Sequence, residues 1–269
     1  MYPYGVLGKI GLYDILMAAG VLIAFVLADK LGVKRGFSLA LQRILIVGFV
    51  IAIALGYLGA VLFQAFYDFM KTGVFKLGAD TGMTFYGGLI FGAGAFLLVW
   101  FIGGKLFCKD GEAVKRFGGI ADIAGCLIPL AHGFGRLGCF FAGCCHGKVT
   151  TAWYGVEMLT ENGWQKVVPV QLYEAAFLFL LAAGLFCLFF KYEGKRRLPL
   201  LALYAVAYGV WRFFIEYARA DDRGATVVAF LSPSQLVALL MIVAGTVYFC
   251  VRFFGKRTEE KKEKIKNNK

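Results

Sequence analysis

The sequence predicts an all-α membrane protein of seven transmembrane helices, with its N-terminus outside the cell and its C-terminus in the cytoplasm. Composition gives the first reason: of 269 residues, 60% are hydrophobic and 17% are charged, and the mean hydropathy is +0.72. A soluble domain of this length cannot bury so much apolar surface. The apolar runs are also too long for the strands of a membrane barrel, which favours helices.

Seven windows of about 20 apolar residues are each long enough to cross about 30 Å of hydrocarbon. The N-terminus lacks the basic segment of a cleavable signal peptide, so we expect the first span to be retained. The sequence predicts one domain over residues 1–254, followed by a charged cytoplasmic tail over residues 255–269. The windows fall near residues 10–28, 44–66, 83–102, 119–141, 170–190, 198–218 and 233–254.

The connections between these spans alternate in basic content. Segments 29–43, 103–118 and 191–197 hold four Lys or Arg residues each and segment 252–269 holds eight, against seven on the opposite side. The positive-inside rule therefore predicts the orientation given above. The formal net charge is +12, but the basic residues separate apolar spans rather than forming one face, so we expect no nucleic-acid partner.

Two arginines lie within apolar spans, where an arginine costs about 2.5 kcal/mol or more. Tyr208, Arg212 and Glu216 are spaced by four residues and so share one helix face. Glu216 either neutralises Arg212 or also orients its guanidinium toward a phosphate, and both interpretations stay open. Arg136 has no carboxylate at helical spacing in its own span, which favours a role in binding a ligand. The likeliest anion within a membrane is a lipid phosphate.

These groups share a depth in the membrane. Arg136 and Arg212 lie about 25 Å and about 21 Å up spans that rise from the cytoplasm. Tyr13 and Tyr86 lie just inside spans that descend from the outer face. Four polar groups from four spans therefore predict a site that opens outward.

The segment around Arg136 is rich in glycine, with Gly133, Gly135 and Gly138 followed by Gly143 and Gly147. Glycines at this density weaken a helix and expose backbone N–H groups. One interpretation is close helix packing through small residues. We favour the other, a cavity lined by these N–H groups that accepts phosphate.

Three of the seven cysteines cluster in the same segment: Cys139, Cys144 and Cys145 lie beside His146. Such a set can bind zinc, form a disulfide in an oxidising compartment, or simply pack or contact the substrate. All three interpretations stay open, with the last favoured. We expect no cofactor.

Taken together, the motifs of this chain resemble those of the bacterial prolipoprotein diacylglyceryl transferases over nearly its whole length. Each motif is modest alone, but the ordered set is specific. In order, the motifs are Ile10–Tyr13, Gly82–Leu89, Ile128–Gly138, Pro169–Glu174, Tyr208–Glu216 and Leu231–Gln235.

The resemblance implies transfer of a diacylglyceryl group from phosphatidylglycerol to the thiol of a lipobox cysteine in a prolipoprotein, at the outer leaflet of the bacterial plasma membrane. A related transferase with another acceptor and a non-catalytic lipid or small-molecule transporter remain alternatives. The expected catalytic residues are Arg136, Arg212, Tyr86 and Glu216. The expected substrate-binding residues are Tyr13, Tyr208, Gly138, Cys139, Gly147, Gln171 and Glu174.

Three departures from the family pattern affect the acceptor side of the reaction. Tyr86 stands where the family usually has a histidine, and a phenol with a pKa near 10 is a poor general base at neutral pH. The family signature continues Gly-Asn-x-x-Asn-Gly-Glu, whereas this chain has cysteine, phenylalanine and alanine from Cys139 to Ala142, so both asparagines and the glutamate are missing. The family often has a histidine directly before its Pro-x-Gln motif, and this chain has Val168 at that position.

Overall fold

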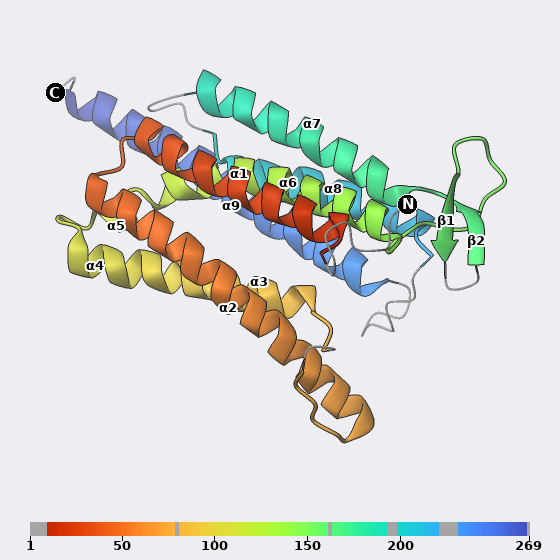
Figure 1. Ribbon diagram of the computed structural model, residues 1–269. Coiled ribbons are helices and arrows are strands. Elements are labelled where there is room, and N and C mark those ends of the chain that lie inside the picture. Colours follow the sequence, from red (N-terminus) through yellow and green to blue (C-terminus); the bar gives the residue numbers. More distant parts are fainter. Residues whose placement is uncertain (1–9, 79–80, 161–162, 193–197, 221–230, 268–269) are drawn as a thin grey trace. The chain divides into compact units, whose positions relative to one another are not determined.

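The computed structural model describes residues 10–78, 81–160, 163–192, 198–220 and 231–267, with side chains to residue 252 (Figure 1). Helices make up most of the described residues. Their bounds are α1 Leu12–Lys34, α2 Leu39–Thr72, α3 Phe85–Leu98, the π-helix η1 Val99–Gly103, α4 Gly104–Phe107, α5 Glu112–Lys115, α6 Phe117–Ala142, α7 Val170–Lys191, α8 Leu200–Ile215, the 3-10 helix η3 Glu216–Ala218 and α9 Pro233–Asn267. The strands are β1 Val156–Thr160 and β2 Gly163–Val167.

Within the residues that the structure describes, seven helical segments are long and apolar enough to cross a membrane, which confirms the predicted fold class of a multi-pass membrane protein. They are Leu12–Lys34, Leu39–Thr72, Phe85–Phe107, Phe117–Ala142, Val170–Lys191, Leu200–Ala218 and Pro233–Arg252. The orientation of the termini stays a prediction. Some of the basic residues counted for it, including Lys9 and Arg223, lie outside the described residues.

Helix α2 is longer than its apolar window, 34 residues in all, because both of its ends are capped. The Ser38 hydroxyl accepts a hydrogen bond from the Leu41 N–H, which satisfies a free donor of the first turn. At the other end, Gly73 adopts φ 72° and its N–H bonds to the Phe69 carbonyl. Polar capping therefore carries this helix beyond its hydrophobic part.

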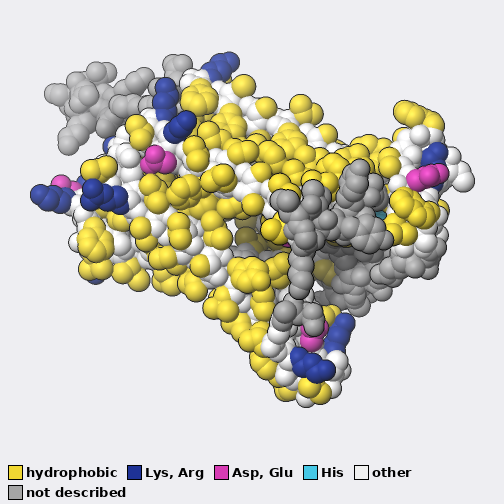
Figure 2. All heavy atoms as spheres, in the orientation of Figure 1, with side chains coloured by type: hydrophobic (Ala, Val, Ile, Leu, Met, Phe, Trp, Pro, Cys, Tyr) yellow, Lys and Arg dark blue, Asp and Glu magenta, His cyan; other side chains and the backbone are white. Residues whose placement is uncertain are grey.

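Large apolar side chains cover the outward sides of the helices, as lipid contact requires. Leu22, Leu98 and Leu180 keep 62%, 61% and 75% of their surface exposed. Figure 2 shows hydrophobic side chains over the helix flanks, with Lys, Arg, Asp and Glu gathered near the helix ends. In water such a surface would drive aggregation, whereas in a bilayer it meets the acyl chains.

The described residues form two compact units. The first comprises residues 1–24 and 121–269, and the second residues 25–120. The single domain predicted over residues 1–254 stays a prediction.

The second unit is built on the packing of α2 against α3. Trp100 of η1 is fully buried, and its indole N–H donates to the Ala113 carbonyl at 3.0 Å. Glu112 of α5 accepts two hydrogen bonds from Ser38, at 3.0 Å from its N–H and 2.6 Å from its hydroxyl. These contacts fasten the short helices after α3 to the start of α2.

The first unit is built around α6, which contacts α7 through Phe134 and Phe179 and contacts the start of α8 through Asp122. The Asp122 carboxylate accepts the Leu200 N–H, a free donor of the first turn of α8. Helix α8 in turn packs on α7 and α9. Pro199 directly precedes α8, where its fixed φ suits a helix start.

From Gly133 to Gly138 the glycine-rich segment is part of a continuous helix, and the phosphate cavity lined by its N–H groups stays a prediction. The glycines permit close contact with neighbouring helices, which was the other interpretation. A Cβ at Gly133 would lie 2.8 Å from the ring of Phe179, and one at Gly138 would lie 3.0 Å from the ring of Tyr13. Packing energy therefore outweighs the lower helix propensity of glycine.

We expect Gly125→Ala to destabilise the protein by about 1–3 kcal/mol, because the added methyl group would meet backbone. A Cβ at Gly125 would lie 2.6 Å from the Leu200 carbonyl carbon, which cannot rotate away. Gly184→Ala on α7 is the control, since a Cβ there has no heavy atom within 4 Å. Thermal unfolding in detergent should lower the midpoint for the first variant only, and equal midpoints would contradict the close packing.

Candidate functional site

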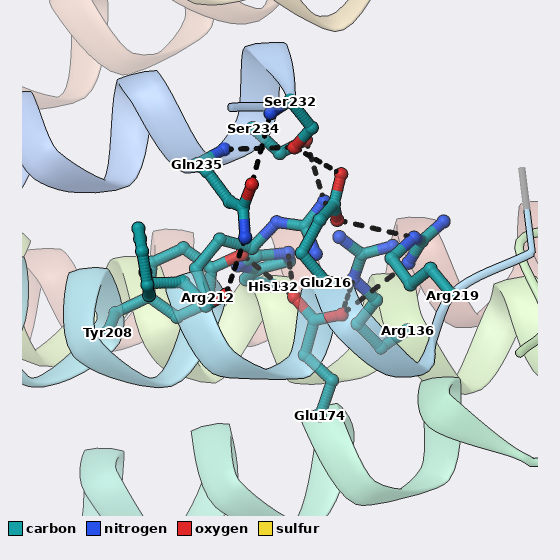
Figure 3. Close-up of polar contacts among 11 residues, drawn as sticks. His132, Arg136, Glu174, Tyr208, Arg212, Glu216, Arg219, Ser232, Ser234 and Gln235 are labelled. Atoms are coloured by element: carbon teal, nitrogen blue, oxygen red, sulfur yellow. Dashed lines mark hydrogen bonds and ion pairs between the residues drawn. The ribbon is translucent and has the colours of Figure 1, made fainter. Parts of the chain in front are cut away.

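A fully buried carboxylate, Glu174 in α7, lies at the centre of a polar network in the first unit (Figure 3). The Tyr208 hydroxyl donates to Glu174 Oε1 at 2.8 Å, and Arg136 Nε lies 3.0 Å from Oε2. Arg219 Nη1 and His132 Nε2 each lie 4.0 Å from the same carboxylate. A buried carboxylate without partners is very costly, so these groups make its position on α7 tolerable.

A second carboxylate, Glu216, joins the other arginines. Arg212 Nη2 lies 2.8 Å from Glu216 Oε2, and the pair is spaced by one helical turn as predicted. Arg219 Nε lies 3.8 Å from the same oxygen and its Nη1 lies 4.0 Å from Glu174. Arg136 and Arg212 are therefore linked through Glu174, Arg219 and Glu216 in one buried network (Figure 3).

The start of α9 supports this network through its capping residues. Ser232 and Gln235 form a reciprocal capping box: Gln235 N–H donates to Ser232 Oγ at 3.2 Å, and Ser232 N–H donates to Gln235 Oε1 at 3.0 Å. The Ser232 hydroxyl also donates to Glu216 Oε1 at 2.8 Å. Arg212 Nη2 donates to Ser234 Oγ at 2.8 Å. Local helix capping thus fixes both members of the Arg212–Glu216 pair.

Among the side chains that the structure describes, the network has more guanidinium groups than carboxylates. Arg136, Arg212 and Arg219 face the carboxylates of Glu174 and Glu216. Arg212 Nη1 is buried and has no hydrogen-bond partner among the residues that the structure describes. An anion with oxygen acceptors would satisfy this donor.

All these side chains lie at one end of their helices. Arg136 lies about 28 Å from the start of α6 and Arg212 about 18 Å from the start of α8, at 1.5 Å per residue. Glu174 lies at the start of the second turn of α7, and Ser234 lies in the first turn of α9. The chain direction alternates between these helices, so the four positions meet at the same end of the first unit.

The segment after α6 closes this end. Gly147 pairs with Arg219 in an isolated β-bridge, and its N–H donates to the Val168 carbonyl at 2.8 Å. The antiparallel hairpin of β1 and β2 follows, with Val156 opposite Val167. Gln171 of α7 donates to the Cys144 carbonyl at 2.6 Å. Gly147 and Gln171, both expected to bind substrate, therefore hold the backbone around the site.

The three clustered cysteines lie together where α6 ends. The Sγ atoms of Cys139, Cys144 and Cys145 are all within 4.8 Å of one another, and none is in a disulfide. Hydrogen bonds from Cys139 and Cys144 lower the pKa of the Cys145 thiol, and the guanidinium groups of Arg219 and Arg136 act in the same direction. Contacts with the other two cysteines raise the pKa of Cys144. The three cysteines that lie near one another in the sequence are therefore also close in space.

Tyr13 and Tyr86, two of the tyrosines expected in the site, belong to different units of the structure. Tyr13 of α1 packs against α6 at Gly138, two residues after Arg136 in the chain. Tyr86 lies in the first turn of α3, in the second unit, and its proposed role stays a prediction. His146 Nδ1 lies 3.0 Å from the Gly147 carbonyl, and His146 does not belong to the described cysteine cluster.

Five members of the network were missed as site residues from the sequence: His132, Arg219, Ser232, Ser234 and Gln235. Arg219 was counted only as a residue of a connection, yet it is 5% exposed and bridges the two carboxylates. The Ser232–Gln235 motif was noticed, and its Ser-x-x-Gln spacing is the signal that indicates a capping box. His132 packs edge-on against Tyr208 with ring centroids 5.1 Å apart, which its spacing of one turn from Arg136 could have indicated.

Fold and site together define a multi-pass membrane protein with a buried, positively charged site at one end of its helices. The chain matches the prolipoprotein diacylglyceryl transferase family over residues 6–251 and belongs to it. It is 33% identical to the phosphatidylglycerol–prolipoprotein diacylglyceryl transferase of Clostridium tetani over 93% of this chain and 96% of the relative.

Two further relatives carry the same name. The enzyme numbered 2 of Clostridium perfringens is 29% identical over 93% of this chain and 94% of its own length. That of Glaesserella parasuis is 30% identical over 88% of this chain and 87% of its own length. The family match therefore covers the whole of the described network.

We expect Glu174→Gln to lower the free energy of unfolding by about 3 kcal/mol, because it leaves Arg136 and Arg219 buried without their shared carboxylate. Glu157→Gln on β1 is the control, because Glu157 is exposed and lies outside the network. Chemical unfolding in detergent measures both. Equal stability of the two variants would mean that Glu174 does not hold the arginines.

Proposed function

We propose that this protein transfers a diacylglyceryl group from phosphatidylglycerol to the thiol of a lipobox cysteine in a prolipoprotein. The observation that supports this most is the buried Arg212 Nη1 donor, which has no hydrogen-bond partner within the described residues. A lipid phosphate has the oxygen acceptors that this donor lacks. The printed names of the relatives give the same donor and acceptor.

In this proposal Arg136 and Arg212 bind the phosphate of the donor lipid. The acceptor thiolate attacks the glycerol carbon that bears the phosphate ester, a C–S bond forms, and the C–O bond breaks. The electron pair of that bond passes to the phosphate oxygen, and glycerol phosphate leaves. Negative charge grows on the phosphate as the bond breaks, so guanidinium groups aimed at it stabilise the transition state more than the bound lipid.

The remaining residues position these two cations. Glu216 and Ser234 both contact Arg212 Nη2, which turns Nη1 away from them. Glu174 Oε2 lies 3.0 Å from Arg136 Nε, and the Tyr208 hydroxyl fixes that carboxylate. In this proposal the outer nitrogens of Arg136 bind the lipid phosphate.

We assign Tyr13, Gly138 and Cys139 to substrate contact, because the α1–α6 contact places them within a turn of Arg136. Tyr86 is proposed as a catalytic residue only on its match to the family motif in α3. The site is proposed to face the outer leaflet. The connections at its end of the helices are the ones poor in Lys and Arg, which the positive-inside rule assigns to the outside.

We expect Arg136→Lys and Arg212→Lys each to lower the rate of transfer about 100-fold or more, because lysine keeps the charge but loses the fork-shaped set of donors. Purified protein, phosphatidylglycerol and a lipobox peptide are combined, and mass spectrometry measures diacylglyceryl peptide. Arg43→Lys, a position in the second unit outside the network, is the control and should keep the rate of the unchanged protein.

The same assay separates the proposal from its alternatives. Consumption of phosphatidylglycerol without modified peptide would indicate a related transferase with another acceptor. An unchanged lipid pool, together with phosphatidylglycerol binding that depends on the two arginines, would indicate a lipid transporter. Rescue of a cell depleted of its own lipoprotein transferase, abolished by either arginine substitution, would support the proposal in vivo.

A further inference from the structure

Three thiols meet where α6 ends, and the backbone there holds them in place. The helix stops at Ala142, after which Gly143 (φ 75°) and Cys145 (φ 59°) turn the chain back on itself. The Cys144 N–H donates to the Cys139 carbonyl at 3.2 Å, and Gln171 of α7 binds the Cys144 carbonyl. A non-glycine residue with positive φ is strained and is retained only where the surroundings enforce it.

The spacing of the three sulfur atoms suits a single metal ion. A zinc–sulfur bond is about 2.3 Å long, so two thiolates on one tetrahedral ion lie about 3.8 Å apart. The three Sγ atoms already lie within 4.8 Å of one another. Binding one ion to all three would therefore bring the sulfur atoms slightly closer together. Soft thiolate sulfur selects thiophilic ions such as Zn²⁺ over Mg²⁺ or Ca²⁺.

The charge around the cluster also suits bound thiolates. Three thiolates and a divalent cation together carry one net negative charge, which suits a position beside the arginines of the network. Cys139 follows Arg136 by three residues on α6, so the cluster lies about one helical turn from the proposed phosphate site. A metal ion here would be a neighbour of the reacting atoms.

Three protein ligands leave one tetrahedral position open, which is the pattern of catalytic rather than structural zinc sites. Within the described residues, the group of possible ligand atoms contains the three cysteines and no histidine or carboxylate. An open position on a thiophilic ion would be taken by water or by another thiol. In the proposed reaction the nucleophile is a thiol.

We propose that Cys139, Cys144 and Cys145 bind one Zn²⁺-type ion, and that its open position takes the sulfur of the acceptor cysteine. This inference rests on the proposed function. A coordinated thiol is deprotonated, and its proton passes to water. The bound sulfur then forms the C–S bond while the C–O bond of the lipid breaks and the electron pair leaves with glycerol phosphate. The metal keeps its charge throughout.

Metal binding is tested first, on purified full-length protein that has been reduced and stripped with a chelator. Zn²⁺ is added, unbound ion is removed, and elemental analysis should find about one ion per chain. Zinc binding should be abolished by any one of the substitutions Cys139→Ser, Cys144→Ser and Cys145→Ser. The control Cys187→Ser, at an exposed position on α7, should bind zinc like the unchanged protein. Thermal unfolding of each variant confirms that it is folded.

Binding of the acceptor thiol is tested next, with Co²⁺ in place of Zn²⁺ as a coloured probe. A lipobox peptide should change the thiolate-to-cobalt absorption, and the same peptide with serine in place of its cysteine should not. The chelator should lower the rate of transfer at least about tenfold, and Zn²⁺ should restore it. The tenfold loss corresponds to about 1.4 kcal/mol in the barrier.

The possible outcomes are separable. Transfer that proceeds unchanged in chelator, or zinc bound equally by the cysteine variants, overturns the metal proposal and leaves the proposed function intact. Thiol counting that finds two of the three cysteines oxidised in freshly purified protein also overturns it, in favour of a disulfide. If the protein binds about one zinc ion per chain and the peptide changes the cobalt spectrum, but no transfer occurs, the metal site is supported and the proposed function is contradicted.

Discussion

The interaction on which the rest of the site depends is the burial of Glu174 between Arg136, Tyr208 and Arg219. An arginine within a membrane is stable only with a partner, and one carboxylate on α7 serves guanidinium groups from two other segments. Because the carboxylate is fully buried, water cannot replace any partner that is lost. The position of α7 relative to α6 and α8 is therefore set by electrostatics at this end and by apolar packing along the rest of the helices.

The capping of α9 gives local structure a second role. Ser232 satisfies the N-terminus of α9 and also donates to Glu216, and Ser234, in the first turn, accepts from Arg212. Helix capping contributes about 1 kcal/mol on its own. Here the same hydroxyl groups orient a guanidinium whose remaining donor is unsatisfied within the described residues. Stability of the helix start and geometry of the site are thus coupled through two serine side chains.

The sequence was sufficient for the seven spans and for the Arg212–Glu216 pair, because apolar length and helical spacing are local properties. It was not sufficient for Arg219, whose role depends on contacts with two other helices. Nor was it sufficient for the glycines of α6, whose low helix propensity is offset by close packing that no local pattern reveals. The closeness of the cysteines depends on a turn with positive φ, which sequence spacing does not encode.

The close packing of α6 also restricts how a diacyl lipid can reach the site. Three glycines of α6 are in close contact with neighbouring segments: Gly138 with Tyr13 of α1, Gly133 with Phe179 of α7, and Gly125 with the backbone of Leu200. These helix contacts, called seams below, leave no space for an acyl chain. The stacked rings of Phe177 and Trp211, 4.3 Å apart, likewise close the contact between α7 and α8. A lipid with two acyl chains that diffuses in the bilayer must therefore reach the site by a route other than these seams. Close helix packing of this kind determines the path that the substrate takes as well as the place where it binds.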